Sequence, residues 1–394
     1  MAGLTIKSFE DTEVAFSYKS DRELKKANFL FSFIKKPVMA DLATWAAKVS
    51  LKIGLPVEKL IKSTVFDHFC GGVTISDCKE TVETLNKFNI GSILDYSVEG
   101  GDSEDGFDST TEEIARTIRN AKGKSEIPFC AFKVSGIAPV NIFEKVQQQE
   151  DLSLEEAEAF KRAKSRIESL CQEAFDNKVP LFIDAEDSWY QDVIDQITYE
   201  MMEKFNKEDA IIYNTYQMYR ADMLYNLEKA IQVAREKGYH LGAKLVRGAY
   251  MEKERERAEE MGYPDPICPD KEATDKSYND GLKACIENID IVAVANCSHN
   301  EYSNYYLTEL IEKNNIDPRN KRAYFAQLYG MSDNISFNLA KAGFRVVKYV
   351  PYGPVKSVMP YLIRRAAENT SVAGQSSREL QLIKKELSRR KNSH

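Results

Sequence analysis

The segment spanning residues 180–217, PLFIDAEDSWYQDVIDQITYEMMEKFNKEDAIIYNTYQ, decides the fold class of this chain. Two short runs rich in apolar and β-branched residues, PLFIDA (180–185) and AIIYNTY (210–216), flank a longer amphipathic stretch. A connection of this length leaves room for a helical return, which favours parallel pairing of the two strands. The segment therefore predicts a β-strand, an α-helix and a second, parallel β-strand.

The same alternation recurs along the chain from about residue 91. It predicts eight strands, at residues 92–98, 128–134, 180–185, 210–216, 242–248, 290–296, 322–328 and 344–350. Between two of them, residues 152–175 place their apolar side chains on one stripe of a helix. Eight strand–helix units in a row favour an α/β protein built as a closed (β/α)8 TIM-type barrel. The alternative is a doubly wound open sheet, but its G-x-G-x-x-G fingerprint is absent from the first strand-to-helix turn.

Three regions are expected along the chain. Residues 1–90 form an N-terminal helical region, with two or three helices between residues 20 and 62; residues 91–372 form the barrel; residues 373–394 form a basic helix or tail. No apolar run reaches the ~18 residues that a membrane span needs, and the N-terminus lacks the pattern of a secretory or transit peptide. We therefore expect a cytoplasmic protein, or the mature form of a mitochondrial matrix protein. The tail is either a solvated helix or a weak peripheral contact with the inner face of an anionic membrane.

The composition excludes several classes of function. The 54 Lys and Arg residues against 61 Asp and Glu residues give a net charge of −7, so no overall positive field attracts nucleic acid. The seven cysteines are scattered, contain no Cys-x-x-Cys pair and are accompanied by four histidines. We therefore expect neither a metal site nor a disulfide framework.

Polar residues gather at the ends of the predicted strands, which is where a barrel of this class builds its active site. They are Lys133, Ser135, Asp184, Glu186, Asn214, Gln217, Lys244, Arg247, Tyr250, Ser298, His299, Asn300 and Gln327. Side chains alternate along a strand, so Lys133 shares a face with Ser135, and Asp184 shares one with Glu186. Charges that point inward must pair with one another or with a charged ligand. For any single charged residue of this set, an ordinary salt bridge at the barrel mouth is the alternative to a role in a ligand site.

The last predicted helix carries a second signal. Tyr361, Arg364, Arg365 and Glu368 stand at positions i, i+3, i+4 and i+7 of one helical stripe. Two adjacent guanidinium groups suit a small carboxylate or a phosphate. A surface helix with an internal Arg–Glu ladder remains the alternative at this point.

These motifs together resemble the monofunctional proline dehydrogenases, a family of FAD-dependent (β/α)8 enzymes. The resemblance covers residues 90–372, and the N-terminal helices more weakly. Its motifs, in order, are KVS (133–135), IDAE (183–186), NTYQ (214–217), KLVRGAY (244–250), EATDKSY (272–278), SHN (298–300), AQLYGM (326–331) and YLIRRAAEN (361–369).

The resemblance implies a role for each matching residue. Arg364 and Arg365 ion-pair with the proline carboxylate, and Lys133 assists them. Asp184 supports this network electrostatically. The walls around the proline ring are Tyr250, Leu328, Tyr349 and Tyr361, and the residues expected to act in catalysis are Lys133, Asp184, Tyr349, Tyr361, Arg364 and Arg365.

The resemblance also implies an FAD site. Its residues are Asn214, Lys244, Arg247, Gly248, Ala249, Thr274, His299, Asn300, Gln327 and Glu368. Lys244 stands where the bifunctional relatives carry an arginine, and a point-charge ammonium differs from a planar fork. His299 is expected to contact the flavin rather than act as a general base.

The implied reaction transfers hydride from C5 of L-proline to flavin N5 and gives Δ1-pyrroline-5-carboxylate. Electrons then pass to a quinone or another acceptor, and a separate pyrroline-5-carboxylate dehydrogenase consumes the product, since only about 20 residues follow the barrel. Tyr349 is expected to crowd a 4-hydroxyl group, which favours proline. The alternatives are a hydroxyproline dehydrogenase, a lyase or aldolase that uses Lys133 or Lys244 as a Schiff-base nucleophile, and a catalytically silent proline-binding protein.

Overall fold

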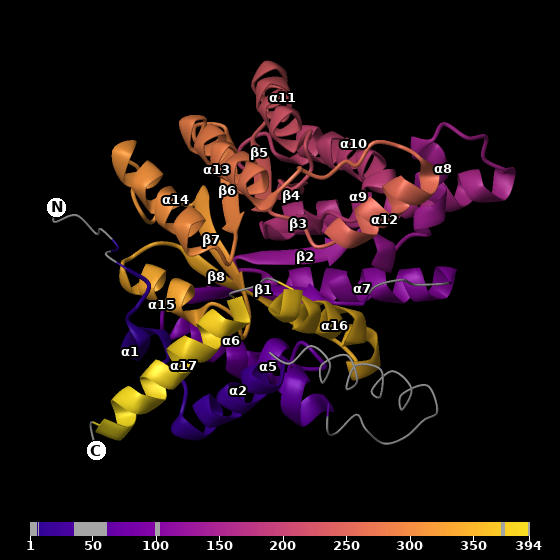
Figure 1. The fold of residues 1–394 in the computed structure, drawn as a ribbon. Coiled ribbons are helices and arrows are strands. Elements are labelled where there is room, and N and C mark those ends of the chain that lie inside the picture. Colours follow the sequence, from indigo (N-terminus) through magenta and orange to yellow (C-terminus); the bar gives the residue numbers. More distant parts are fainter. Residues whose placement is uncertain (1–5, 7, 35–60, 99–102, 372–374, 393–394) are drawn as a thin grey trace. The chain divides into compact units, whose positions relative to one another are not determined.

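The strands form one closed parallel barrel in chain order. The computed structural model describes residues 6, 8–34, 61–98, 103–371 and 375–392 (Figure 1). The strands are β1 (Ile90–Tyr96), β2 (Phe129–Lys133), β3 (Leu181–Asp184), β4 (Ile212–Gln217), β5 (Leu241–Val246), β6 (Val292–Cys297), β7 (Ala323–Leu328) and β8 (Val346–Tyr352). This confirms the predicted fold class, and each strand end lies within two residues of its predicted position.

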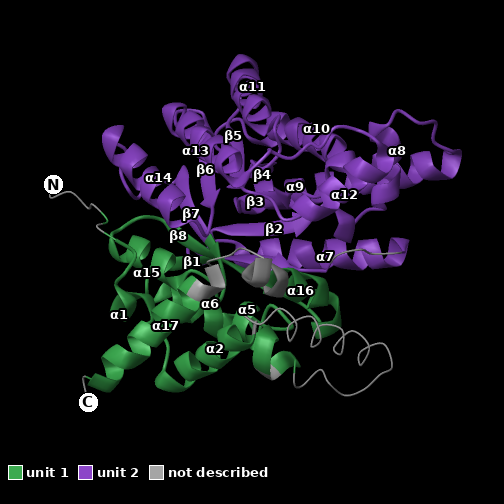
Figure 2. Ribbon diagram, in the orientation of Figure 1, with its two compact units in different colours: residues 1–92, 327–394 green, residues 93–326 purple. Residues whose placement is uncertain are grey.

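The chain divides into two compact units (Figure 2). Unit 2, residues 93–326, contains α7 (Glu104–Ala121), α8 (Val140–Gln147), α9 (Leu154–Asn177), α10 (Ser188–Phe205), α11 (Met223–Lys237), α12 (Met251–Met261), α13 (Lys271–Glu287) and α14 (Glu301–Lys313). Within it, α10, α11 and α13 pack against strands β4 to β6 (Figure 1). The helix expected at residues 152–175 is α9, which begins with a capping box formed by Ser153 and Glu156.

Unit 1 comprises residues 1–92 and 327–394. Its helices are α1 (Thr12–Ala15), α2 (Asp21–Ile34), a π-helical turn (Lys62–Phe66), α5 (Asp67–Phe69), α6 (Lys79–Asn86), α15 (Asp333–Lys341), α16 (Val355–Ser371) and α17 (Gln375–Asn392). The helix expected around residues 40–50 lies outside the described residues. A buried apolar cluster joins α1, α2, α5, α16 and α17.

The inner face of the barrel is identified by its aromatic rings. The ring of Phe129 on β2 stacks on Phe182 of β3, with centroids 4.6 Å apart, and both rings contact Tyr213 of β4. Lys133 and Asp184 share this face because they lie four and two residues further along β2 and β3. The apolar floor therefore lies directly before the charged strand ends.

The basic C-terminal region forms α17, and several of its cations form ion pairs within unit 1. Arg390 ion-pairs with Asp21 at 2.8 Å and with Glu386 at 2.7 Å, and Lys385 lies 3.2 Å from Glu10. These pairs leave less positive charge for an anionic membrane than the sequence of the tail suggests. No helix in the described part of the chain is both long enough and apolar enough to cross a bilayer.

A buried ionic cluster lies in unit 1, and we call it the Asp333 cluster: Tyr18, Lys19, Asp333, Lys348 and Glu379. Asp333 at the start of α15 ion-pairs with Lys348 at 2.9 Å and with Lys19 at 3.5 Å, and it accepts a 2.8 Å hydrogen bond from the Tyr18 hydroxyl. Glu379 of α17 accepts a hydrogen bond from the backbone N–H of Ser332, the N-cap of α15. The cluster thus connects both terminal segments to β8 and α15.

The pKa values of the two buried carboxyls of the cluster are shifted in opposite directions. Burial, reinforced by the negative charge of Asp333, raises the pKa of Glu379 from 4.5 to about 7. Burial acts on Asp333 as well, but Lys348 and Lys19 outweigh it and hold the pKa of that carboxyl at about 2. An ionised Glu379 is therefore unfavourable in the folded protein, whereas an ionised Asp333 is favourable.

We expect Glu379→Gln to change how stability depends on pH. The folded-state pKa lies above the unfolded value, so between about pH 4.5 and 7 the folded protein keeps a proton that the unfolded chain releases. The free energy of unfolding contributed by this group is present below pH 4.5 and is lost as the pH rises through 7. Glu379→Gln should remove this decline and be more stable than the wild type at pH 8, by up to about 2–3 kcal/mol.

Urea unfolding between pH 5 and 8 measures this effect. Glu386→Gln is the matched control on the same helix, because Arg389 and Arg390 lower the pKa of that carboxyl against the effect of burial. The control should lose stability at pH 8. Identical pH dependence in the wild type and Glu379→Gln would contradict the assignment.

Candidate active site

A compact charged cluster lies on the inner face of the barrel in unit 2. Asp184, at the end of β3, ion-pairs with Lys244 of β5 at 2.6 Å and with Lys133 of β2 at 3.5 Å. Asp184 and Lys244 are 7% and 5% exposed, and the Lys244 ammonium lies 5.4 Å from the centroid of the Phe182 ring. Of the two expectations for inward charges, pairing with one another or with a charged ligand, the structure shows the first for these residues. A carboxylate held between two ammonium groups makes this end of the barrel a charged site, which suits a polar or electron-rich ligand.

The loops that follow β2 and β3 are fixed to one another. Glu186 accepts a 2.9 Å hydrogen bond from the backbone N–H of Ser135, and its own N–H donates to the Gln191 side-chain oxygen at 2.6 Å. Both Glu186 and Gln191 are buried. These bonds hold the strand ends that carry Lys133 and Asp184 in register.

The structure does not bring Asn214 together with this cluster. The Asn214 amide donates to Asp195 of α10 at 3.0 Å, and its oxygen accepts from the backbone N–H of Thr215. The side chain therefore faces the helical layer, where burial raises the pKa of Asp195 to about 6.

Gln217 takes the inward position at the end of β4. Thr215 is in register with Lys244, and Gln217 follows two residues later on the same face. Gln217 is 2% exposed, and its side-chain oxygen has no hydrogen-bond partner among the described residues. A buried amide oxygen of this kind is costly unless a ligand satisfies it. Gln217 is the candidate that sequence reasoning noticed at the strand end but left out of the predicted site.

Arg247, just beyond β5, is held by three partners in unit 2. Its guanidinium donates to Asp275 at 2.8 Å, to the Ser298 hydroxyl at 2.8 Å and to the Ser303 hydroxyl at 2.9 Å. It also lies 4.3 Å from the centroid of the Tyr278 ring. The ends of β5 and β6 and the first turns of α13 and α14 are therefore joined around one planar cation.

Three further predicted residues lie on these same elements. Thr274 is in the first turn of α13 and donates to the Asp270 carbonyl at 3.1 Å, and Asn300 caps α14 by accepting from the Ser303 N–H at 3.0 Å. His299, half-buried, lies between Ser298 and Asn300. The structure thus gathers Arg247, Thr274 and Asn300 near one another in unit 2.

Gly248 and Tyr250 follow Arg247 in a strained turn. Gly248 has φ +135°, and a Cβ there would lie 2.5 Å from ring atoms of Tyr219. Ala249 comes next, and Tyr250 then caps α12 and is half-buried. Only glycine satisfies both the backbone angle and the contact with the Tyr219 ring.

Other predicted residues of unit 1 lie on β8 and α16. Tyr349 and Tyr361 are 7% and 5% exposed, and the Arg365 guanidinium lies 5.1 Å from the centroid of the Tyr361 ring. This is the i, i+4 neighbourhood predicted for α16. Arg364 is half-buried, and the side chain of Glu368 lies outside the described residues.

Leu328 and Gln327 end β7 and point to opposite faces. Leu328 is half-buried, next to the apolar cluster of unit 1. The Gln327 oxygen accepts a 2.8 Å hydrogen bond from the Ser336 hydroxyl of α15, so this amide faces the helix. Like Asn214, it is engaged by the helical layer.

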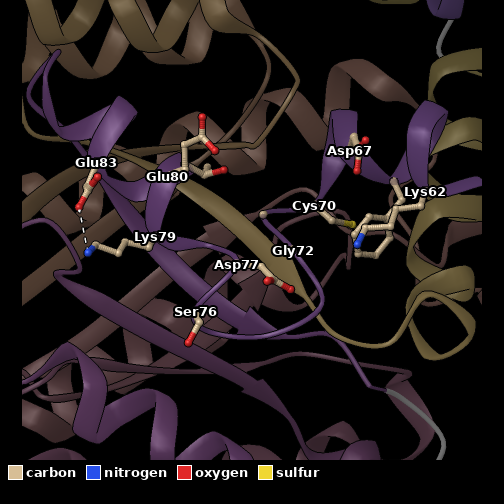
Figure 3. A pocket seen from close by; sticks show the side chains of 12 residues that line it. Lys62, Asp67, Cys70, Gly72, Ser76, Asp77, Lys79, Glu80 and Glu83 are labelled. Atoms are coloured by element: carbon tan, nitrogen blue, oxygen red, sulfur yellow. Dashed lines mark ion pairs between the residues drawn. The ribbon is translucent and has the colours of Figure 1, made fainter. Parts of the chain in front are cut away.

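A hollow of about 670 Å3 lies elsewhere in unit 1 (Figure 3). Its lining includes Lys62, Asp67, Asp77, Lys79 and Glu83, charges of both signs that are open to solvent. It contains none of the predicted site residues, so the chemistry is to be sought at the strand ends.

Comparison with known proteins gives a family. The family model described as proline dehydrogenase matches residues 78–378. A protein named proline dehydrogenase 1, mitochondrial, from Dictyostelium discoideum is 35% identical and covers 96% of this chain and 74% of its own length. A human protein of the same name is 45% identical over 58% of this chain and 39% of its own length.

Two further similarities complete this comparison. The carbapenem antibiotics biosynthesis protein CarD of Pectobacterium carotovorum is 34% identical and covers 83% of this chain and 85% of its own length. The fold resembles the crystal structure of proline utilization A from Bdellovibrio bacteriovorus inactivated by N-propargylglycine. The TM-score is 0.72 at 21% identity, over 93% of this chain and 40% of that one.

We expect Gly248→Ala to lower the free energy of unfolding by about 2–5 kcal/mol, because it combines positive φ with a steric overlap. Gly238→Ala is the matched control: Gly238 has φ +65° and open space around its Cβ position, so about 1 kcal/mol is expected. Denaturant unfolding of both variants measures the difference. Equal losses would show that the Tyr219 ring yields and imposes no constraint.

Proposed function

Because the chain belongs to the proline dehydrogenase family, we propose that it oxidises L-proline at C5 to Δ1-pyrroline-5-carboxylate with FAD as its cofactor. The observation that carries the proposal is the buried cluster of Lys133, Asp184 and Lys244 at the carboxyl ends of β2, β3 and β5. Active sites of (β/α)8 enzymes lie at this end of the strands.

The residues of unit 2 fit FAD. Gln217 offers a buried amide oxygen that needs a donor, and Lys244 offers a buried cation where electron density would accumulate. The residues that would hold the cofactor are Gln217, Lys244, Arg247, Gly248, Ala249, Thr274, His299 and Asn300. Asn214 and Gln327, which the resemblance also implies, would act on the cofactor through neighbouring groups. Glu368 remains a proposed cofactor-binding residue on the resemblance alone. FAD, when bound, supplies the two-electron acceptor.

Substrate binding falls to the cations and aromatic rings. Arg364 and Arg365 bind the proline carboxylate through paired, charge-assisted hydrogen bonds, and Lys133 adds a third cation. Tyr250, Leu328, Tyr349 and Tyr361 orient the ring and exclude water. Asp184 balances Lys133 and Lys244 so that the site carries a limited positive charge.

Proton transfer needs no dedicated base in this scheme. The amine of proline enters deprotonated, so C5 gives up its hydride without a side chain removing a proton in the same step. The predominance of cations over candidate bases supports this view.

The electrons leave for a quinone, and a separate dehydrogenase oxidises the product. The curated relatives named as mitochondrial support a mitochondrial matrix location, with a cytoplasmic location as the alternative. A contact with a membrane surface would give access to a quinone pool.

The Schiff-base lyase is the alternative chemistry on this barrel. Both candidate nucleophiles, Lys133 and Lys244, are ion-paired with Asp184, and a charged ammonium is not a nucleophile. An anaerobic visible spectrum of the purified protein, recorded before and after L-proline is added, decides between the two. A flavin band that bleaches supports the proposal, whereas a colourless protein that does not bind added FAD overturns it. A bound flavin that L-proline does not bleach would support the cofactor and show that the substrate is a different compound.

We expect Arg365→Met to raise KM for L-proline by about 10- to 100-fold while the bound flavin remains, because a charge-assisted contact to the carboxylate is lost. Lys356→Met is the matched control: it removes one exposed positive charge from the same helix. Steady-state kinetics and the flavin content per chain are the measurements. A wild-type KM in Arg365→Met would remove this arginine from the carboxylate site.

We expect Tyr349→Ser to increase kcat/KM for trans-4-hydroxy-L-proline relative to L-proline by about tenfold, since removing a steric conflict of about 1.4 kcal/mol has that effect. Tyr349→Phe keeps the ring and should keep the preference for proline. The ratio of the two kcat/KM values is the readout. An unchanged ratio in Tyr349→Ser would show that another residue sets the specificity.

A further inference from the structure

Lys348 is a fully buried cation that the proposed chemistry does not use. It lies on β8 directly before Tyr349, so its side chain points to the opposite face of the strand. Its ammonium donates to the backbone carbonyls of Leu328, at 3.3 Å, and Met331, and it ion-pairs with Asp333 at 2.9 Å. Removing a lysine from water costs several kcal/mol unless partners of this kind surround it.

The two carbonyls bracket the turn that follows β7. Within this turn the backbone N–H of Tyr329 donates to the Tyr349 carbonyl at 2.9 Å. Leu328 and Tyr349, two of the predicted walls around the substrate ring, are therefore fastened to one another by Lys348 and by this backbone bond.

A histidine fixes the same turn from another element. Nε2 of His68 lies 2.9 Å from the Gly330 carbonyl. Burial lowers the pKa of His68 to about 3, so the ring is neutral and its Nε2–H donates. Gly330 has φ +77°, and a Cβ there would lie 2.2 Å from the His68 carbonyl. The turn therefore has little freedom to move on that side.

Both terminal segments complete the support. Tyr18 donates to Asp333 while its ring stacks on Phe337, with centroids 4.6 Å apart, and Lys19 lies 3.5 Å from the same carboxylate. Glu379 of α17 accepts from the N–H of Ser332, directly after the turn. The N-terminal region, to which sequence reasoning could give no role, thus reaches the back of the predicted substrate wall.

We propose that Lys348 is a positioning residue which, through Asp333 and Tyr18, holds the turn of residues 329–331 and thereby sets the spacing of Leu328 and Tyr349. This inference rests on the proposed function, in which these two side chains are walls of the ring site and Tyr349 crowds a 4-hydroxyl group. An apolar residue at position 348 would fill the volume, but it would leave the two carbonyls without their donor and Asp333 with Lys19 as its remaining described cation.

The test uses two variants of different severity. Lys348→Met removes the cation, and Tyr18→Phe removes only the hydrogen bond to Asp333 while the stack on Phe337 remains. We expect KM for L-proline to rise about 3- to 10-fold in Tyr18→Phe and further in Lys348→Met, with kcat and flavin content near wild type. The preference for proline over trans-4-hydroxy-L-proline should fall in both. If Lys348→Met fails to fold, Tyr18→Phe carries the test.

Arg390→Met is the matched control. Arg390 connects the same terminal segments by donating to the carbonyls of Phe16 and Lys19, each at 2.9 Å, and to Asp21 at 2.8 Å. It contacts the backbone of Lys19 and not its ammonium, and the described contacts of its side chain do not include the turn or the Tyr18 hydroxyl. It should lower the melting temperature without changing KM. An equal rise of KM in Arg390→Met, or a wild-type KM in Tyr18→Phe and in any folded Lys348→Met, would overturn the positioning role.

Hydrogen–deuterium exchange separates this inference from the proposed function. The peptide covering residues 327–331 contains the Tyr329 amide, and it should exchange faster in Tyr18→Phe and Lys348→Met than in the wild type or Arg390→Met. This measurement needs no substrate. Unchanged exchange refutes the positioning role even where proline bleaches the flavin, and faster exchange upholds it even if proline proves not to be the substrate.

Discussion

Side chains alternate between the two faces of a β-strand, and this constraint determines which polar residues of the barrel can act together. Lys244 and Gln217 lie on the inner face, whereas Asn214 turns outward to Asp195. On β8, Tyr349 and Lys348 are neighbours in sequence and serve opposite faces. The strands therefore supply a side chain for chemistry on one face and a side chain for support on the other. The polar residues of the outer face contact the helices and turns that support the site.

The inner face combines an apolar floor with a partly balanced charge. Phe129, Phe182 and Tyr213 pack together next to the charged group of Lys133, Asp184 and Lys244, and close packing excludes water from that level of the barrel. Electrostatic interactions are stronger where water is excluded, so the charged groups at the strand ends act more strongly on a ligand there than they would in water. Asp184 ion-pairs with both ammonium groups, and removing one partner of a buried ion pair costs several kcal/mol. The carboxylate thus lowers the free-energy cost of burying these ammonium groups.

The sequence predicts the fold better than it predicts the faces. Each strand is a short apolar run between polar segments. Eight such runs, separated by segments long enough to form a helix, identify the barrel. All six residues of β4 are buried, so no polar–apolar alternation shows that Gln217 rather than Asn214 faces inward. The register with β5 supplies this information, because it aligns Thr215 with Lys244. The bond between Tyr18 and Asp333 joins residues 315 positions apart, and no local pattern predicts a contact of that separation.

The positioning role proposed for Lys348 gives a reason for the buried ions of the Asp333 cluster. A hydrophobic replacement of a buried ion pair is often as stable as the pair, so stability alone does not account for Lys348. An ammonium that donates to two particular carbonyls, however, admits one arrangement of the turn, whereas apolar contacts admit several. In the proposed function, discrimination between proline and its hydroxylated analogue depends on a difference of about one oxygen atom in the width of the ring site. On that proposal, directional bonds behind the wall would hold this width, and the terminal segments would supply the partners that keep those bonds buried.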